Sequence, residues 1–146
     1  MRKQQKIWTK EHATGGSIPS ETEDDSWKHP SGHVVTFIED YGLKTSAKAI
    51  DIGCGKGRNS VYLAKQGLLV TAMDYAKPAT DNVKRIAKQE DLRSLEVITA
   101  PMDQKWPFED EVFDIAIDCY SSIDVETREG REVYRDELLR TLKPLS

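Results

Sequence analysis

The sequence predicts an α/β fold in which a mostly parallel β-sheet lies between two layers of helices. Three observations predict this class. The chain has 146 residues, close to the size of one domain. Short apolar segments alternate with segments of helical periodicity from residue 47 onward, and a glycine-rich turn directly follows the first apolar segment. We therefore expect one three-layer domain.

The apolar segments give the expected strands, which cover residues 49–52, 68–73, 95–99 and 112–117. Segments with one apolar face predict helices over residues 58–66, from Pro78 onward and over 127–142. A first helix precedes the sheet, because Ser31 can cap it and Gly42 ends it after about Tyr41. Trp106-Pro107-Phe108 breaks regular structure, so we expect a loop after the third strand.

The composition is that of a soluble domain. Hydrophobic residues make up 38% of the chain, charged residues 32%, and the mean hydropathy is −0.60. The longest apolar run, residues 68–73, is far too short to span a bilayer. The net charge of −4 argues against electrostatic binding of nucleic acid across the whole surface. Two cysteines form no disulfide framework, so the expected location is the reducing cytoplasm.

Residues 1–30 are polar and irregular, with a Gly-Gly-Ser-Ile-Pro-Ser stretch at 15–20 and an acidic run that begins at Glu21. We interpret them as a flexible lead-in to a domain that covers residues 31–146. His29 and His33 are separated by Pro30 and have no evident cysteine or carboxylate partner nearby. A metal site is therefore not expected.

The most informative segment is a strand that leads through a glycine turn into a helix, Ala49-Ile50-Asp51-Ile52-Gly53-Cys54-Gly55-Lys56-Gly57-Arg58-Asn59. Its three glycines permit a tight turn and a close approach of a ligand to the backbone. Free N–H groups at the start of the helix would stabilise a ligand carboxylate. At the end of the strand, Asp51 could take the ammonium group of an amino-acid ligand, directly or through water.

A second acid, Asp74, follows the next expected strand, 23 residues after Asp51. The tips of adjacent parallel strands lie side by side, and a carboxylate there can accept both hydroxyls of a ribose. The dinucleotide fingerprint would need a third glycine at Arg58, which weakens the nicotinamide alternative. Adenosine joined to an amino acid describes S-adenosylmethionine, which is therefore the predicted ligand.

From Ala49 to about Pro144 the chain resembles class I, Rossmann-like S-adenosylmethionine-dependent methyltransferases. The string Gly55-Lys56-Gly57-Arg58-Asn59-Ser60, with Tyr62-Leu63-Ala64 and Gly67 behind it, is similar to tellurite-resistance-type small-molecule methyltransferases. Trp106-Pro107-Phe108, followed by Phe113-Asp114, is similar to the stretch before the fourth strand in the wider family. The resemblance implies methyl transfer to an acceptor, which we expect to be a small molecule.

The resemblance also implies roles for individual residues. The residues that would hold the methionine end of the cofactor are Asp51, Gly53, Cys54, Gly55 and Gly57, with Arg58 and Asn59 at the helix start as further candidates. Asp74 would bind the ribose, and Tyr75 could cover one face of the adenine. Met102 and Asp103 would contact the adenine from the loop after the third strand. Asp118 would lie beside the methionine and the acceptor.

One departure from the family concerns the extent of the sheet. Complete members have seven strands, whereas this chain stops after the helix that follows the fourth. We expect a truncated chain or fragment, or a homo-oligomer in which a second copy covers the edge of the fourth strand. The alternatives in function are a module that binds S-adenosylmethionine without catalysis and a nicotinamide-dependent oxidoreductase. No catalytic base is assigned; Tyr120, His29 and His33 are the candidates.

Overall fold

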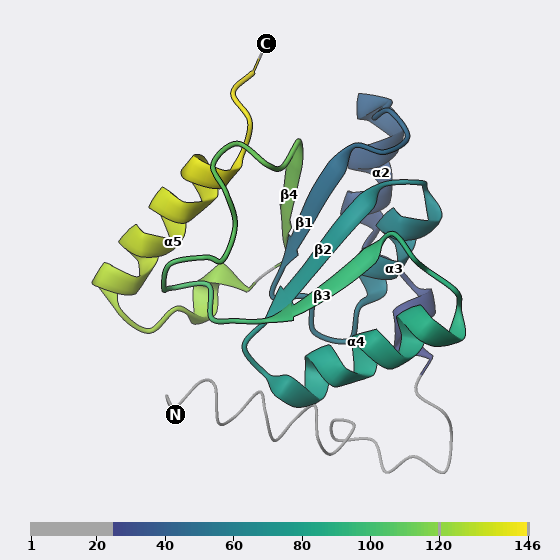
Figure 1. Ribbon diagram of the computed structural model, residues 1–146, viewed down its shortest axis with the longest axis horizontal. Coiled ribbons are helices and arrows are strands. Elements are labelled where there is room, and N and C mark those ends of the chain that lie inside the picture. Colours follow the sequence, from purple (N-terminus) through teal and green to yellow (C-terminus); the bar gives the residue numbers. More distant parts are fainter. Residues whose placement is uncertain (1–24, 120, 146) are drawn as a thin grey trace.

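The computed structural model describes residues 25–119 and 121–145 (Figure 1). Most of the predicted lead-in and Tyr120 lie outside these residues. The described part begins with a short 3-10 helix, η1 (Ser26–Lys28), in which Trp27 is buried. The ammonium groups of Lys28 and Lys65 each lie 5.4 Å from the centre of the Trp27 ring. The packed part of the chain therefore begins before residue 31, where the sequence analysis set the domain boundary.

The sheet has four strands in the order β3-β2-β1-β4 (Figure 1). Their bounds are Lys48–Ile52 for β1, Leu69–Asp74 for β2, Leu95–Thr99 for β3 and Ile115–Asp118 for β4. Every pairing is parallel, which confirms the predicted α/β class. The chain moves outward from β1 through β2 to β3 and then crosses to the other side of β1. This reversal of direction is the place where open α/β sheets bind ligands.

Helices cover both faces of the sheet, as predicted. The helices α2 (Gly32–Tyr41), α3 (Arg58–Lys65) and α4 (Lys77–Gln89) lie on one face, and α5 (Arg128–Thr141) lies on the other (Figure 1). Gly42, in the left-handed conformation, ends α2, and Pro78 stands in the first turn of α4. The hydroxyl of Thr127 accepts a hydrogen bond from the N–H of Gly130 and so caps α5.

The core has two parts because successive side chains of β1 point to opposite faces. Ala49 packs in the layer of α2, α3 and α4, whereas Ile50 and Ile52 pack in the layer of α5. Side chains that are at most 2% exposed fill both layers, among them Val61, Val83 and Ile86 in the first and Met73, Trp106 and Phe113 in the second. Burial on both faces fixes the sheet, whose carboxyl edge then forms a rigid base for a site.

One strand and one helix cap differ from the prediction. We expected a strand from Val112, whereas β4 begins at Ile115. The N–H groups of Val112 and Phe113 donate to the carbonyl of Thr141, at 2.8 and 2.9 Å, and so bind at the end of α5 instead of joining β1. Ser31 stands at the N-cap of α2, but its side chain makes no capping bond.

The outer edge of β4 has little cover. Leu142 pairs with Phe113 in an isolated parallel bridge, and no other described segment pairs with this edge. None of the described helices is long and apolar enough to cross a membrane.

The segment Trp106–Phe108, predicted as a break in regular structure, is held by α5. The Arg140 guanidinium donates to the carbonyls of Trp106 and Phe108, at 3.3 and 2.8 Å. It also donates to the carboxylates of Asp110, at 2.9 Å, and Glu137, at 3.0 Å. The side chain of Arg140 is only 25% exposed. One planar guanidinium thus joins α5 to the segment that precedes β4.

We expect Arg140→Ala to lower the free energy of unfolding by about 1 to 3 kcal/mol, because carbonyl and carboxylate groups lose a charged donor. Arg140→Lys should recover little, since a single ammonium cannot reach the same set of acceptors. Arg135→Ala is the matched control, because the Arg135–Asp136 pair is largely exposed and should contribute almost nothing. Urea unfolding of the variants checks this; equal midpoints for Arg140→Ala and Arg135→Ala would refute it.

Candidate functional site

The carboxyl ends of β1, β2 and β4 bring most of the predicted site residues to one edge of the sheet. Ile52, at the end of β1, pairs with Met73 on β2 and with Asp118 on β4. The glycine turn leaves β1 between these two neighbours and leads directly into α3, as predicted. The site is therefore built on three strand ends and one helix start, which packing holds in place.

Close contacts require glycine at two positions of the turn. Gly53 has φ +66°, and a Cβ there would lie 2.2 Å from the Cβ of Ser121 in the loop after β4. Gly57, the N-cap of α3, has φ +85°, and its Cβ would lie 2.9 Å from Val83 on α4. The turn is thus pressed against the loop after β4 on one side and against α4 on the other.

Asp74 connects the tip of β2 to the glycine turn. The side chain is buried, and its Oδ2 accepts a hydrogen bond from the N–H of Gly55 at 3.0 Å. Its Oδ1 accepts from the N–H of Ala76 at 2.9 Å. Each carboxylate oxygen can accept more than one hydrogen bond, so Asp74 keeps the capacity to accept from the hydroxyls of a ligand.

Asp51 lies beneath the first turn of α3, away from the open edge of the sheet. The residue is 2% exposed, and its Oδ2 accepts a hydrogen bond from the Ser60 hydroxyl at 2.6 Å. Burial, with smaller contributions from the charges of Asp74 and Asp118, raises the pKa of Asp51 to about 7, although hydrogen bonds from Ser60 oppose the rise.

Asp118 is the centre of a hydrogen-bonded group at the tip of β4. Its Oδ1 accepts from the N–H groups of Ser121 and Ser122 and from the Ser121 hydroxyl, at 2.9, 3.2 and 2.9 Å. Its Oδ2 accepts from the Tyr134 hydroxyl of α5 at 2.6 Å. Burial raises the pKa of Asp118, but the hydrogen bonds from Tyr134, Ser122 and Ser121 outweigh it and the pKa is lowered. Asp118 is therefore ionised at neutral pH.

The residues at the start of α3 contact α2 and the end of β4. The Asn59 amide oxygen accepts from the N–H of Ser31 at 2.9 Å, which ties α2 to α3. One Arg58 guanidinium nitrogen lies 3.7 Å from the sulfur of Cys119, the residue that follows β4. Cys54 is buried, and burial raises the pKa of its thiol well above the usual value. Both cysteines are free thiols, and Cys54 is a packing residue.

The predicted adenine contacts divide between two places. Met102 reaches the glycine turn, since its Cε would lie 3.5 Å from a Cβ at Gly53. Asp103 instead lies beside α5, with its Cβ 3.2 Å from the position of a Cβ at Gly130. Tyr75 directly follows Asp74 and is half-buried. Met102 and Tyr75 therefore flank the turn and the acid, whereas Asp103 lies nearer to α5.

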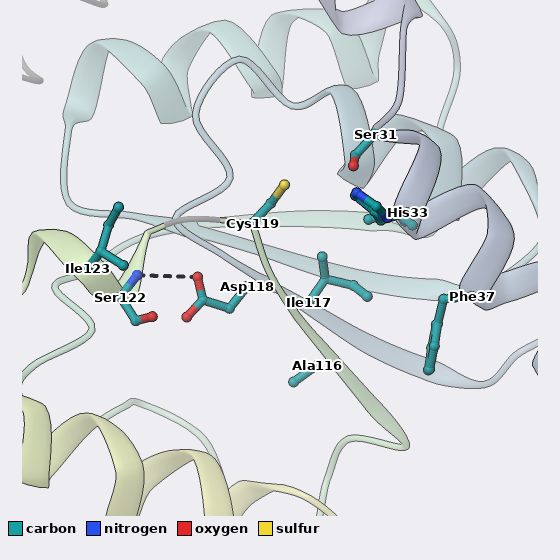
Figure 2. Close-up of a pocket in the computed structure, with 10 residues that line it drawn as sticks. Ser31, His33, Phe37, Ala116, Ile117, Asp118, Cys119, Ser122 and Ile123 are labelled. Atoms are coloured by element: carbon teal, nitrogen blue, oxygen red, sulfur yellow. Dashed lines mark hydrogen bonds between the residues drawn. The ribbon is translucent and has the colours of Figure 1, made fainter.

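An open groove of about 520 Å³ lies between α2 and β4. Its lining consists of Ser31, His33, Val34, Phe37, Ala116, Ile117, Asp118, Cys119, Ser122 and Ile123 (Figure 2). Polar side chains gather near the carboxyl end of β4, whereas Ala116, nearer the amino end of β4, and Phe37 of α2 lie away from them (Figure 2). Of the candidate bases, His33 lines the groove, His29 does not, and Tyr120 lies outside the described residues. Within the described ranges, no group of three or more His, Cys, Asp or Glu side chains could hold a metal ion.

Several residues of the site were missed by sequence reasoning. Ser60 holds Asp51, and Ser121 and Ser122 hold Asp118. The serines that follow Asp118 carry a local signal, because an aspartate commonly accepts N–H groups a few positions later. Tyr134 carries no such signal, since it comes from another element 16 residues away.

A parallel sheet in the order β3-β2-β1-β4, with a glycine turn after β1 and an acid after β2, is the arrangement of Rossmann-like nucleotide-binding domains. Comparison with known proteins agrees. Residues 49–145 match the family described as Methyltransferase domain, and the chain belongs to this family. The predicted class is confirmed, whereas the finer likeness to tellurite-resistance-type enzymes stays a prediction.

Individual relatives are distant. A curated protein of Geobacillus sp. (strain WCH70), named among methyltransferases, is 34% identical over 60 residues, which are 41% of this chain and 23% of that protein. A SAM-dependent methyltransferase structure from Methanosarcina mazei is 28% identical over 74% of this chain and 52% of its own, with a TM-score of 0.66. A SAM-dependent methyltransferase structure from Aquifex aeolicus shares the fold, with a TM-score of 0.69. It is 22% identical, and the match covers 83% of this chain and 63% of that one. The match to the Geobacillus protein spans about a quarter of that relative.

Proposed function

We propose that this chain binds S-adenosylmethionine across the carboxyl ends of β1 and β2 and transfers its methyl group to a small-molecule acceptor. One observation carries the proposal: Asp74 accepts a hydrogen bond from Gly55 at 3.0 Å. This bond sets the glycine turn and the acid after β2 side by side, so that one ligand can contact both. When bound, S-adenosylmethionine supplies an electrophilic methyl group on a sulfonium sulfur.

The residues present fit such a ligand. Gly53, Gly55 and Gly57 all have positive φ, a backbone conformation that glycine adopts without strain, so the turn can stay tight. Asp74 keeps lone pairs for two ribose hydroxyls. Arg58 is exposed at the place where a dinucleotide turn needs a third glycine. This supports an adenosyl amino acid over a nicotinamide dinucleotide.

We assign roles from these positions. The turn from Gly53 through Cys54 to Gly57 holds the methionine end by its backbone, and the negative charge of Asp51 attracts the ammonium group from beneath the turn. Asp74 accepts the ribose hydroxyls. Met102 and Tyr75 enclose the adenine, and Asp103 reaches it only if its side chain leaves α5.

The acceptor enters the groove between α2 and β4, whose polar end lies at the tip of β4 (Figure 2). The apolar wall of Val34, Phe37 and Ala116 suits a small apolar body. Asp118 is ionised, and the described lining contains no lysine or arginine, so a neutral or cationic acceptor is favoured over an anionic one. An acceptor that must lose a proton needs a base, for which His33 is the described candidate.

Alignment supplies most of the catalysis in this proposal. Holding donor and acceptor in line can contribute roughly 7 to 11 kcal/mol toward the barrier, so little covalent chemistry falls to the protein. A rigid sheet edge with a packed turn and a fixed Asp118 meets that requirement. Product formation with a panel of small uncharged acceptors distinguishes an enzyme from a module that only binds the donor.

We expect Asp74→Ala to weaken binding of S-adenosylmethionine and its demethylated product by about 1 to 3 kcal/mol, since buried ribose hydroxyls lose a charged partner. Asp74→Asn, which keeps one acceptor oxygen, should lose less. Asp81→Ala is the control, because Asp81 is an exposed α4 carboxylate paired with Lys77. Calorimetric titration checks this, with NAD as a third ligand. Unchanged affinity in Asp74→Ala, or tighter binding of NAD than of both adenosyl ligands, would contradict the proposal.

A further inference from the structure

The Tyr134 side chain has two separate functions in the fold. Its ring packs edge-on against Trp106, with centroids 6.1 Å apart, in the core layer beneath α5. Its hydroxyl reaches beyond this layer to Asp118, at 2.6 Å. The packing accounts for an aromatic ring at this position, but it does not account for the hydroxyl.

The two oxygens of the Asp118 carboxylate bind two different elements. Oδ2 is held by Tyr134 from α5, which leaves Oδ1 to the loop after β4. In that loop the Ser121 hydroxyl lies 2.9 Å from Oδ1 and 2.6 Å from the carbonyl of Ile52, at the end of β1. Ser121 is therefore fixed between β4 and β1, where its Cβ lies against Gly53.

A chain of short contacts thus leads from α5 to the glycine turn, through Tyr134, Asp118 and Ser121 to Gly53. The α5 end of the chain is itself fixed, because Arg140 joins the same helix to the carbonyls of Trp106 and Phe108. Each contact is between buried or half-buried groups, where hydrogen bonds to a charge are strong.

We propose that Tyr134 is a positioning residue for methyl transfer: its hydroxyl orients Asp118 so that Ser121 holds the loop after β4 against the glycine turn. The inference rests on the proposed function, since the turn and Asp118 flank the place where donor and acceptor meet. Tyr134 itself lies on α5 and does not line the acceptor groove. It acts through Asp118.

The charged and titratable groups around Asp118 come from several elements. Tyr134 of α5 binds Asp118, and the charge of Asp118 acts on Asp51 of β1. Cys119 follows Asp118 in the chain, and the guanidinium of Arg58 from α3 lies against the Cys119 sulfur. His33 of α2 lines the same groove as Asp118. Among the hydrogen bonds that lower the pKa of Asp118, the bond from Tyr134 has the largest effect. Loss of the hydroxyl should consequently raise this pKa toward its ordinary value.

The test is Tyr134→Phe, which keeps the ring against Trp106 and removes only the hydroxyl. The pKa of Asp118 is measured by carbon-13 NMR of aspartate-labelled protein, a readout that does not depend on activity. The proposal expects a rise in Tyr134→Phe and no change in Tyr62→Phe, which removes a hydroxyl on α3. An unchanged Asp118 pKa in Tyr134→Phe would overturn the proposal.

Positioning is measured by titration with S-adenosylhomocysteine, the demethylated product. Tyr134→Phe should bind it roughly tenfold more weakly, and so should Ser121→Ala. The double variant should be little worse than either single one, because both changes release the same loop. Fully additive losses, or binding by Tyr134→Phe within twofold of the unchanged protein, would overturn the positioning role.

The outcomes separate this inference from the proposed function. If the unchanged protein does not bind S-adenosylhomocysteine, the donor assignment fails, and the positioning role fails with it even when the pKa of Asp118 responds to Tyr134. If the unchanged protein binds the product but neither variant changes affinity or pKa, the proposed function stands and only the role of Tyr134 is lost.

Discussion

Gly53→Ala should abolish measurable binding of S-adenosylmethionine and lower the free energy of unfolding by about 2 to 4 kcal/mol. Two costs add at this position. An alanine at φ +66° is strained, and its Cβ would lie 2.2 Å from the Cβ and 2.4 Å from the hydroxyl oxygen of Ser121. Ser121 must then move, which breaks its 2.6 Å contact with the carbonyl of Ile52. The turn and the loop after β4 are displaced together.

Gly42→Ala is a matched control for the strain alone. Gly42 also has a positive φ, +57°, but a Cβ there meets nothing within 4 Å. It should cost about 1 kcal/mol and leave ligand binding unchanged. Combining Gly53→Ala with Ser121→Gly makes room for the new Cβ and should restore part of the stability. Thermal unfolding with calorimetric titration checks the set. Equal effects of Gly42→Ala and Gly53→Ala would show that the contact with Ser121 has no importance.

Asp51→Asn should stabilise the ligand-free protein at pH 8 and weaken donor binding. The folded-state pKa of Asp51 is raised from 3.8 to about 7, so the folded chain keeps a proton that the unfolded chain has already released. The stability that Asp51 contributes is fully present at pH values below its pKa in the unfolded chain. It is lost as the pH rises through its pKa in the folded chain. The loss amounts to about 4 kcal/mol at most, at about 1.4 kcal/mol per pKa unit. Asparagine does not ionise, so the variant avoids this loss of stability, and its amide oxygen can still accept the hydrogen bond from Ser60.

The difference in unfolding free energy between Asp51→Asn and the unchanged protein should therefore grow from about pH 4 to about pH 7 and then stay constant. Binding should change in the opposite direction, because the variant lacks the charge that attracts the ligand ammonium. Asp114→Asn is a useful contrast, since the hydrogen bond from the Lys48 N–H lowers the pKa of Asp114 and its stabilising effect is lost on acidification. A pH-independent difference for Asp51→Asn would contradict this account of Asp51.

The sequence predicted the framework because the framework follows from local signals. The alternation of short apolar segments with amphipathic ones predicted all four strands, and Gly42 and Pro78 predicted where helices end and begin. The glycine turn after β1 and Asp74 after β2 are also local patterns, and their proximity follows from parallel pairing. These features needed no knowledge of tertiary contacts.

The finer arrangement depends on contacts that a linear pattern does not contain. Asp51 was assigned to a ligand ammonium from its position before the turn, whereas its hydrogen bond from Ser60 of α3 was not predicted. Asn59, a binding candidate, accepts a hydrogen bond from the Ser31 N–H, a contact between α2 and α3 that no local pattern predicts. The start of β4 was predicted too early, because the N–H groups of Val112 and Phe113 bind a carbonyl of α5. Each difference is a tertiary hydrogen bond that competes with a local expectation.

The proposed donor site can be tested by a crystal structure of the chain soaked with S-adenosylhomocysteine. We expect density across the ends of β1 and β2, with both ribose hydroxyls on the carboxylate of Asp74 and the amino-acid end over the turn from Gly53 to Gly57. Clear density for the ligand elsewhere, or an unchanged turn without ligand at saturating concentration, would contradict it.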